Sequence, residues 1–179
     1  MTSSSEGGIS SDHILGFARH LLSHRVGGRH TPAGGFTRQQ CEEVIHRLAP
    51  SENLFYALRI DGRFPSISTR TVSRQSKPYP RLADAAAAEP TVTLTDTTGS
   101  VVGFHTPDYA QGIGVAGYHL HYLSADHQSG GHVFDFTVED PRIRIDSEAE
   151  LHLSLQTTDE FLSTRFGGDV SAEIDRAET

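Results

Sequence analysis

The sequence predicts an α+β fold, in which a mostly antiparallel or mixed β-sheet carries two or three short helices. Three observations lead to this prediction. A capping-box pattern opens one helical stripe near residue 37, strand-like runs follow in quick succession, and Gly, Pro or Asp-Gly positions separate those runs. With 179 residues, the chain is long enough for one compact domain with a sizeable core.

The clearest helix is expected to begin at Arg38. Thr37 and Gln40 have the spacing of a capping box, and Pro50 ends the helical pattern. The apolar stripe behind the cap has the helical spacing i, i+3, i+4, i+7 and comprises Cys41, Val44, Ile45 and Leu48. Two further short helices are expected, an Ala-rich one over residues 82–88 and one near the C-terminus.

The other elements are expected to be strands joined by turns and loops. LFYALRI (54–60) should turn at Asp61-Gly62 into a returning strand over residues 63–72. A proline-braced loop over residues 73–82 comes next. The later strand-like runs are TVTLT (91–95), SVVGFHT (100–106), YHLHYLS (118–124), HVFDFTV (132–138), RIRID (142–146) and ELHLSL (150–155), with a turn expected at 96–99.

Composition excludes several classes of protein. A net charge of −8 argues against a nucleic-acid partner, which would need concentrated Lys and Arg. No apolar run approaches the roughly 20 residues needed to span a bilayer, and the N-terminus does not read as a secretory signal. Cys41 is alone, so an intramolecular disulfide is impossible. We therefore expect a soluble cytoplasmic protein without a membrane partner.

Residues 1–35 differ from the rest, because they are rich in Ser, Gly, His and Arg. We expect an atypical, loosely ordered N-terminal segment there, and a separate domain over residues 36–179. His20 and His24 in HLLSH have the spacing of the zincin motif, but Leu21 stands where that motif needs a glutamate. Solvated side chains are the simpler interpretation of these two histidines.

A metal site is predicted at His119, His121 and His132. Strand side chains alternate between faces, so His119 and His121 share one face. If the next strand returns in a hairpin centred near Asp126 and His127, His132 lies across from His121, about 5 Å away. Three imidazoles with a position left open are typical of a catalytic metal site, although a lone H-x-H is common by chance.

The remaining histidines in residues 36–179 are interpreted as structural or solvated. His127 falls in the expected hairpin loop and His46 on the first helix, while His105 and His152 lack a paired register. Arg70, near a strand end, could bind a carboxylate with two parallel hydrogen bonds. A surface position or an ion pair is the more common role of such an arginine.

Several segments together resemble the bacterial alpha-acetolactate decarboxylase family. They are FYALRIDGRFPSISTRTVSRQSKPYPRL, VVGFHTPDY and GVAGYHLHYLSADHQSGGHVFDF, in this order. The resemblance runs from Phe36 to the C-terminus, and it identifies the chain as an N-terminally truncated or atypical member. It implies an α+β fold that corresponds to the C-terminal two-thirds of the family's fold.

The resemblance also implies site residues and a reaction. The family's metal ligands match His119, His121 and His132, and its active-site arginine matches Arg70. Its tail glutamate matches Glu178, with Glu173 as the alternative. The implied reaction is decarboxylation of 2-acetolactate to acetoin and carbon dioxide, with Zn²⁺ or another divalent ion. The family suggests a homodimer.

Two alternatives stay open at this level. Family members carry a further region before the helix, with another active-site glutamate, and residues 1–35 do not resemble it. A catalytically impaired remnant that retains metal binding is therefore the second hypothesis. The third is a cupin-type β-barrel with an H-x-H metal motif. Cupins usually place a glutamate a few residues later, whereas Leu123, Ser124, Ala125 and Asp126 stand here.

Overall fold

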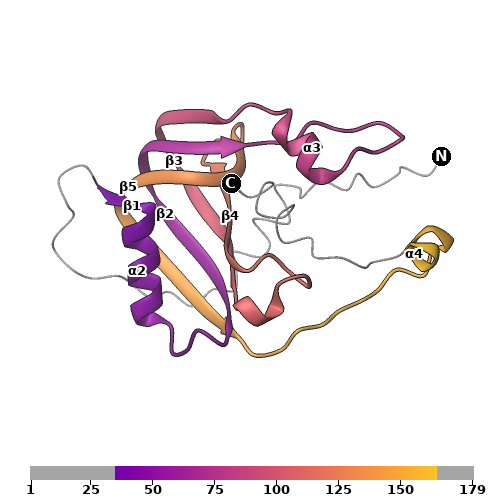
Figure 1. Cartoon of the computed structure of the whole chain (residues 1–179). Coiled ribbons are helices and arrows are strands. Elements are labelled where there is room, and N and C mark those ends of the chain that lie inside the picture. The colour runs from indigo at the N-terminus through magenta and orange to yellow at the C-terminus, as the bar shows by residue number, and fades with distance from the viewer. Residues whose placement is uncertain (1–34, 165–179) are drawn as a thin grey trace.

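The computed structural model describes residues 35–164 and confirms the predicted fold class, a mostly antiparallel sheet with short helices (Figure 1). The elements in chain order are β1 (Phe36–Thr37), α2 (Arg38–Leu48), β2 (Phe55–Arg70), α3 (Leu82–Ala87), β3 (Val92–Thr106), the 3-10 helix η1 (Asp108–Ala110), β4 (Gly117–Ser124), β5 (Gly130–Glu148) and α4 (Asp159–Ser163). None of the helices in this range is long and apolar enough to cross a membrane.

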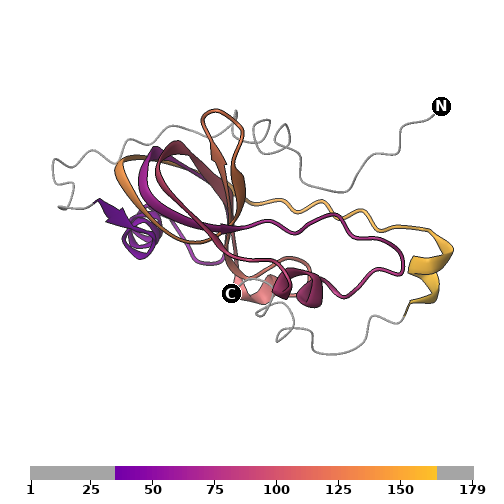
Figure 2. The same cartoon turned by 90° about the horizontal axis from the view of Figure 1, so that it is seen from above.

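The strands form one sheet that closes on itself. Their order is β1-β5-β2-β3-β4, every pairing is antiparallel, and β5 also pairs with β4. The four long strands therefore curve around a common interior, which is visible as a ring from above (Figure 2). The buried residues that fill this core from the strands are Tyr56, Leu58, Ile60, Phe64, Ile67, Val101, Leu120, Tyr122, Val133, Phe136, Val138, Ile143 and Ile145.

Helix α2 begins where the capping box predicts. The Thr37 hydroxyl accepts a hydrogen bond from the Gln40 amide, and the Gln40 side chain accepts one from the Thr37 amide. The predicted stripe buries Cys41, Val44 and Ile45 in the core. Leu48, the last helical residue, is 45% exposed, so the buried stripe ends one turn before the helix does.

The thiol of Cys41 is fully buried, and this burial, with a smaller contribution from Glu42, raises its pKa to about 12. Because the thiolate is the nucleophile, iodoacetamide at pH 8 is expected to leave Cys41 unmodified in the folded protein and to alkylate it in urea. Equal alkylation rates with and without urea, measured by mass spectrometry, would contradict the buried position.

The raised pKa of Cys41 also predicts that the stability of the fold decreases as the pH rises above 9.0, where the thiol of an unfolded chain begins to lose its proton.

The prediction of a hairpin turn at Asp61-Gly62 is wrong, because both residues lie inside the continuous strand β2. Asp61 pairs with Ser100 of β3 and Arg142 of β5, and its carboxylate accepts hydrogen bonds from Ser100 and Arg59 at 2.6 and 2.7 Å. A Cβ atom at Gly62 would lie only 2.5 Å from the Val138 side chain. The glycine therefore serves the close approach of β5 rather than a turn.

Three other strand boundaries also differ from the sequence prediction. The turn expected at 96–99 is part of β3, in which Asp96 has a positive φ of 51°. HVFDFTV and RIRID belong to one long strand, β5, which bends at Asp140 with φ 46°. ELHLSL forms no strand: Leu151, Leu153 and Leu155 are exposed in the segment that leads away from the sheet to α4 (Figure 1).

Candidate metal centre

The hairpin formed by β4 and β5 brings three histidines together. His121 pairs directly with His132, Tyr122 with Gly131 and Leu123 with Gly130. This register is the one predicted from the sequence, with Asp126 and His127 at the centre of the connecting turn. His119 lies two residues before His121 on the same face of β4. The antiparallel pairing therefore brings the three imidazoles to one place.

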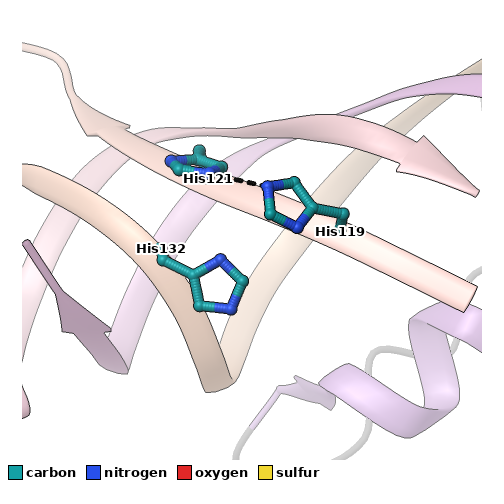
Figure 3. A group of neighbouring side chains, drawn as sticks. All are labelled: His119, His121 and His132. Carbon is teal, nitrogen blue, oxygen red and sulfur yellow. Dashed lines mark hydrogen bonds between the residues drawn. The ribbon is translucent and has the colours of Figure 1, made fainter. Parts of the chain in front are cut away.

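The nitrogen atoms of the three rings lie close enough to hold one ion. One nitrogen from each histidine can be chosen so that all three lie within 4.8 Å of one another. The Nε2 atoms of His119 and His121 are 3.1 Å apart (Figure 3). Nitrogen ligands at about 2.05 Å from a tetrahedral zinc ion would be separated by about 3.3 Å. The donor set and its spacing therefore fit a divalent metal.

The cluster lies on the face of β4 that points away from the core. Leu120 and Tyr122, which alternate with the histidines, are 1% exposed and belong to the core. His119, His121 and His132 are half-buried. Three neutral imidazoles leave the charge of a bound cation uncompensated, and a half-buried position leaves room for a further ligand.

Arg70, the last residue of β2, lies beside this cluster. It pairs with His132 across the β2–β5 ladder, and its guanidinium carbon lies 4.7 Å from the centre of the Phe134 ring. The Phe134 ring in turn meets the His132 ring edge-on, with centroids 5.3 Å apart. A Cβ atom at Gly131 would lie 2.6 Å from the Arg70 carbonyl oxygen, so this glycine permits the close approach. The structure thus places the positively charged side chain of Arg70 beside His132.

The other histidines of residues 35–164 lie apart from the cluster. His127 is exposed in the hairpin turn, and His46 is exposed and 2.9 Å from Glu52. His105 pairs with Tyr118 and packs against its ring on the opposite face, where burial lowers the pKa of the imidazole. His152 lies in the exposed segment after β5.

Some predicted residues fall outside the described part of the chain. Glu178 and its alternative Glu173 belong to residues 165–179, so the structure does not test either position. The same holds for the N-terminal histidines His13, His20, His24 and His30. The expected division at residue 35 likewise stays a prediction.

Sequence reasoning did not identify Phe134, which contacts both Arg70 and His132. Simple alternation from the core residues Phe136 and Val138 would place Phe134 in the core as well. The predicted pairing with His121 requires His132 to point away from the core, whereas regular alternation from Phe136 would turn it toward the core. Together these two requirements indicate an irregularity in β5.

Comparison with known proteins gives a consistent result. The family profile described as alpha-acetolactate decarboxylase matches residues 12–167, a range that begins before Phe36 and ends before Glu173. The chain is 45% identical over 165 residues to the alpha-acetolactate decarboxylase of Bacillus licheniformis, covering 92% of this chain and 63% of the relative. Identity to the Bacillus subtilis enzyme is 41% over 158 residues, covering 88% of this chain and 60% of the relative.

Solved structures agree with the sequence matches. The crystal structure of alpha-acetolactate decarboxylase from Bacillus subtilis strain 168 superposes with a TM-score of 0.77 at 40% identity. The superposition covers 83% of this chain and 64% of that chain. The chain therefore spans somewhat less than two thirds of the length of these relatives.

Proposed function

Because this chain belongs to the alpha-acetolactate decarboxylase family, we propose that it catalyses the metal-dependent decarboxylation of 2-acetolactate to acetoin and carbon dioxide. The observation that carries the proposal is the convergence of three imidazoles on one face, with Arg70 paired to one of them. Family membership also argues against the cupin-type reading of the H-x-H motif.

His119, His121 and His132 would hold the cation, which is Zn²⁺ or another divalent ion. When bound, such an ion supplies a Lewis acid that polarises a ketone oxygen. The neutral donors suit this role, because they do not cancel the positive charge.

Arg70 would orient the substrate through its carboxylate. A guanidinium offers two parallel N–H donors that match a carboxylate, and the contact with the Phe134 ring limits the positions that the guanidinium can adopt. Departure of carbon dioxide breaks the bond between the carboxylate carbon and C2 and leaves its electron pair on the substrate as an enediolate. The positive charge of Arg70 would stabilise that negative charge.

Formation of acetoin then requires a proton at carbon. We propose Glu178, or Glu173 in its place, as the acidic group that supplies it from the C-terminal tail. The homodimer, which the family resemblance suggests, and the cytoplasmic location, which the composition suggests, stay predictions.

The direct test measures acetoin made from 2-acetolactate by the purified 179-residue chain, with the metal content of the same sample. We expect turnover that is lost after removal of metal by a chelator and restored by Zn²⁺ or another divalent ion. Metal binding without acetoin would overturn the proposal in favour of an impaired remnant. Acetoin formation that survives complete metal removal would contradict the metal dependence.

A further inference from the structure

Strand β5 changes the face it presents between Val133 and Phe136. Val133, Phe136 and Val138 are all buried in the core, although the first two lie three positions apart and the last two lie two positions apart. The pairing with β2 shows the cause, because Ser68 pairs with Asp135 whereas Thr69 pairs with Val133. Phe134 is thus an extra residue, the signature of a β-bulge.

This bulge decides where His132 points. In a regular strand, residues 132, 134, 136 and 138 would share one face, and His132 would point into the core with Phe136 and Val138. The extra residue shifts the alternation, so that Val133 enters the core and His132 points outward beside His121. Phe134 also stays on the outer side, where it contacts Arg70.

The bulge is held by a side chain from another element. Strand β5 pairs with β4 up to His132 and with β1 from Thr137 onward. In the interval between these pairings, Arg38 of α2 donates hydrogen bonds from Nη1 to the carbonyl oxygens of Phe134 and Val133, at 2.6 and 3.3 Å.

The position of Arg38 is itself fixed on the helix. Its Nε donates to the Glu42 carboxylate one turn later at 2.7 Å, which leaves Nη1 directed at β5. Backbone carbonyls that a bulge removes from the ladder need a donor, since an unpaired buried carbonyl is costly. Both Arg38 and Glu42 are only 25% exposed, so water competes little for these contacts.

We propose that Arg38 is a positioning residue, which holds the β5 bulge and thereby keeps His132 in the metal-binding arrangement. Nothing in this role requires Arg38 to touch metal or substrate. The inference rests on the metal site of the proposed function, but it does not depend on turnover. It predicts that the geometry of a site on the β4–β5 hairpin is sensitive to the first turn of α2.

The test is metal binding by the full chain carrying Arg38→Met, which keeps an unbranched, helix-compatible side chain but removes every donor. Binding of Co²⁺ is measured by its visible absorption, and Zn²⁺ affinity by competition with a chromophoric chelator. We expect Zn²⁺ affinity to fall about 10-fold or more, the range seen when outer-shell partners of metal ligands are lost. The Co²⁺ spectrum should change shape as well, because His132 no longer occupies one orientation.

Two variants separate positioning from general effects. Arg47→Met removes the same charge from the exposed last turn of α2 and is expected to bind both metals like the wild type. Glu42→Gln removes the charge of the ion pair, but its amide oxygen can still accept the hydrogen bond from Nε of Arg38 and keep Nη1 directed at β5. The Zn²⁺ affinity of this variant should therefore stay close to that of the wild type. If Arg38→Met does not melt cooperatively, Arg38→Lys replaces it. That variant is expected to show a smaller loss, since one ammonium cannot reproduce the guanidinium geometry.

Each result bears on the inference in a definite way. An Arg38 variant that folds and retains wild-type metal affinity and the wild-type Co²⁺ spectrum would overturn it. Equal losses in Arg38→Met and Arg47→Met would do the same, as would a wild-type chain that binds neither metal. Wild-type metal binding without acetoin formation would instead count against the proposed reaction, and the inference would stand.

Discussion

Replacing His121 with alanine is expected to lower Zn²⁺ affinity by more than about 100-fold, beyond the range for loss of an outer-shell partner. His121 contributes to the cluster from β4, where it pairs with His132 and its Nε2 atom lies 3.1 Å from that of His119. Two remaining imidazoles on separate strands would leave the ion mostly to water. Acetoin formation should fall by at least about 100-fold, as expected when an electrophilic group that stabilises developing charge is lost.

The matched control for this substitution is His127→Asn. His127 lies in the same hairpin, but it is exposed and its φ is 59°, a conformation that asparagine tolerates well. Zn²⁺ affinity and acetoin formation should both stay at wild-type values. If His121→Ala retained stoichiometric metal on a chelator titration, the three-histidine site would be incorrect.

Arg70→Lys is expected to reduce kcat/KM for 2-acetolactate by about 100-fold while Zn²⁺ affinity changes little. Lysine keeps the positive charge but loses the planar pair of donors that matches a carboxylate. It also loses the flat contact that the guanidinium makes with Phe134. The expected defect is therefore in substrate orientation and charge stabilisation, and steady-state kinetics with a parallel metal assay would measure it.

The control is Arg63→Lys on the same strand. Arg63 is exposed and forms ion pairs with Asp96 and Glu139, and the same substitution there should leave kcat/KM unchanged. A loss of metal affinity in Arg70→Lys as large as the loss of activity would show that Arg70 acts on the cluster rather than on the substrate. Wild-type kinetics in that variant would remove Arg70 from the proposed mechanism.

Local sequence patterns predicted the elements whose causes are themselves local. The capping box of Thr37 and Gln40 and the apolar stripe of α2 depend on residues within four positions of each other. The β4–β5 pairing was predictable for a similar reason, because a short turn sets its register and the His121–His132 pair lies only eleven positions apart.

Predictions failed where a residue's role depends on a distant strand. Asp61-Gly62 has the local composition of a hairpin turn, yet β2 continues through it because β3 and β5 pair on both sides. ELHLSL has the alternation of a strand, but no strand of residues 35–164 pairs with it. Local propensity therefore misplaced boundaries whenever long-range pairing determined the backbone.

The sequence by itself determined which residue types could bind a metal and which two histidines share a face, because strand alternation is a property of the backbone. The sequence also predicted that His132 lies across from His121. Only the tertiary structure showed how β5 turns His132 to that face while Phe136 and Val138 stay in the core. That placement depends on the β5 bulge, whose register is set by β2 and whose carbonyls are held by Arg38, 95 and 96 positions away in the sequence. The closed sheet also brings Arg70 to the cluster, since β5 pairs with both β2 and β4 at His132.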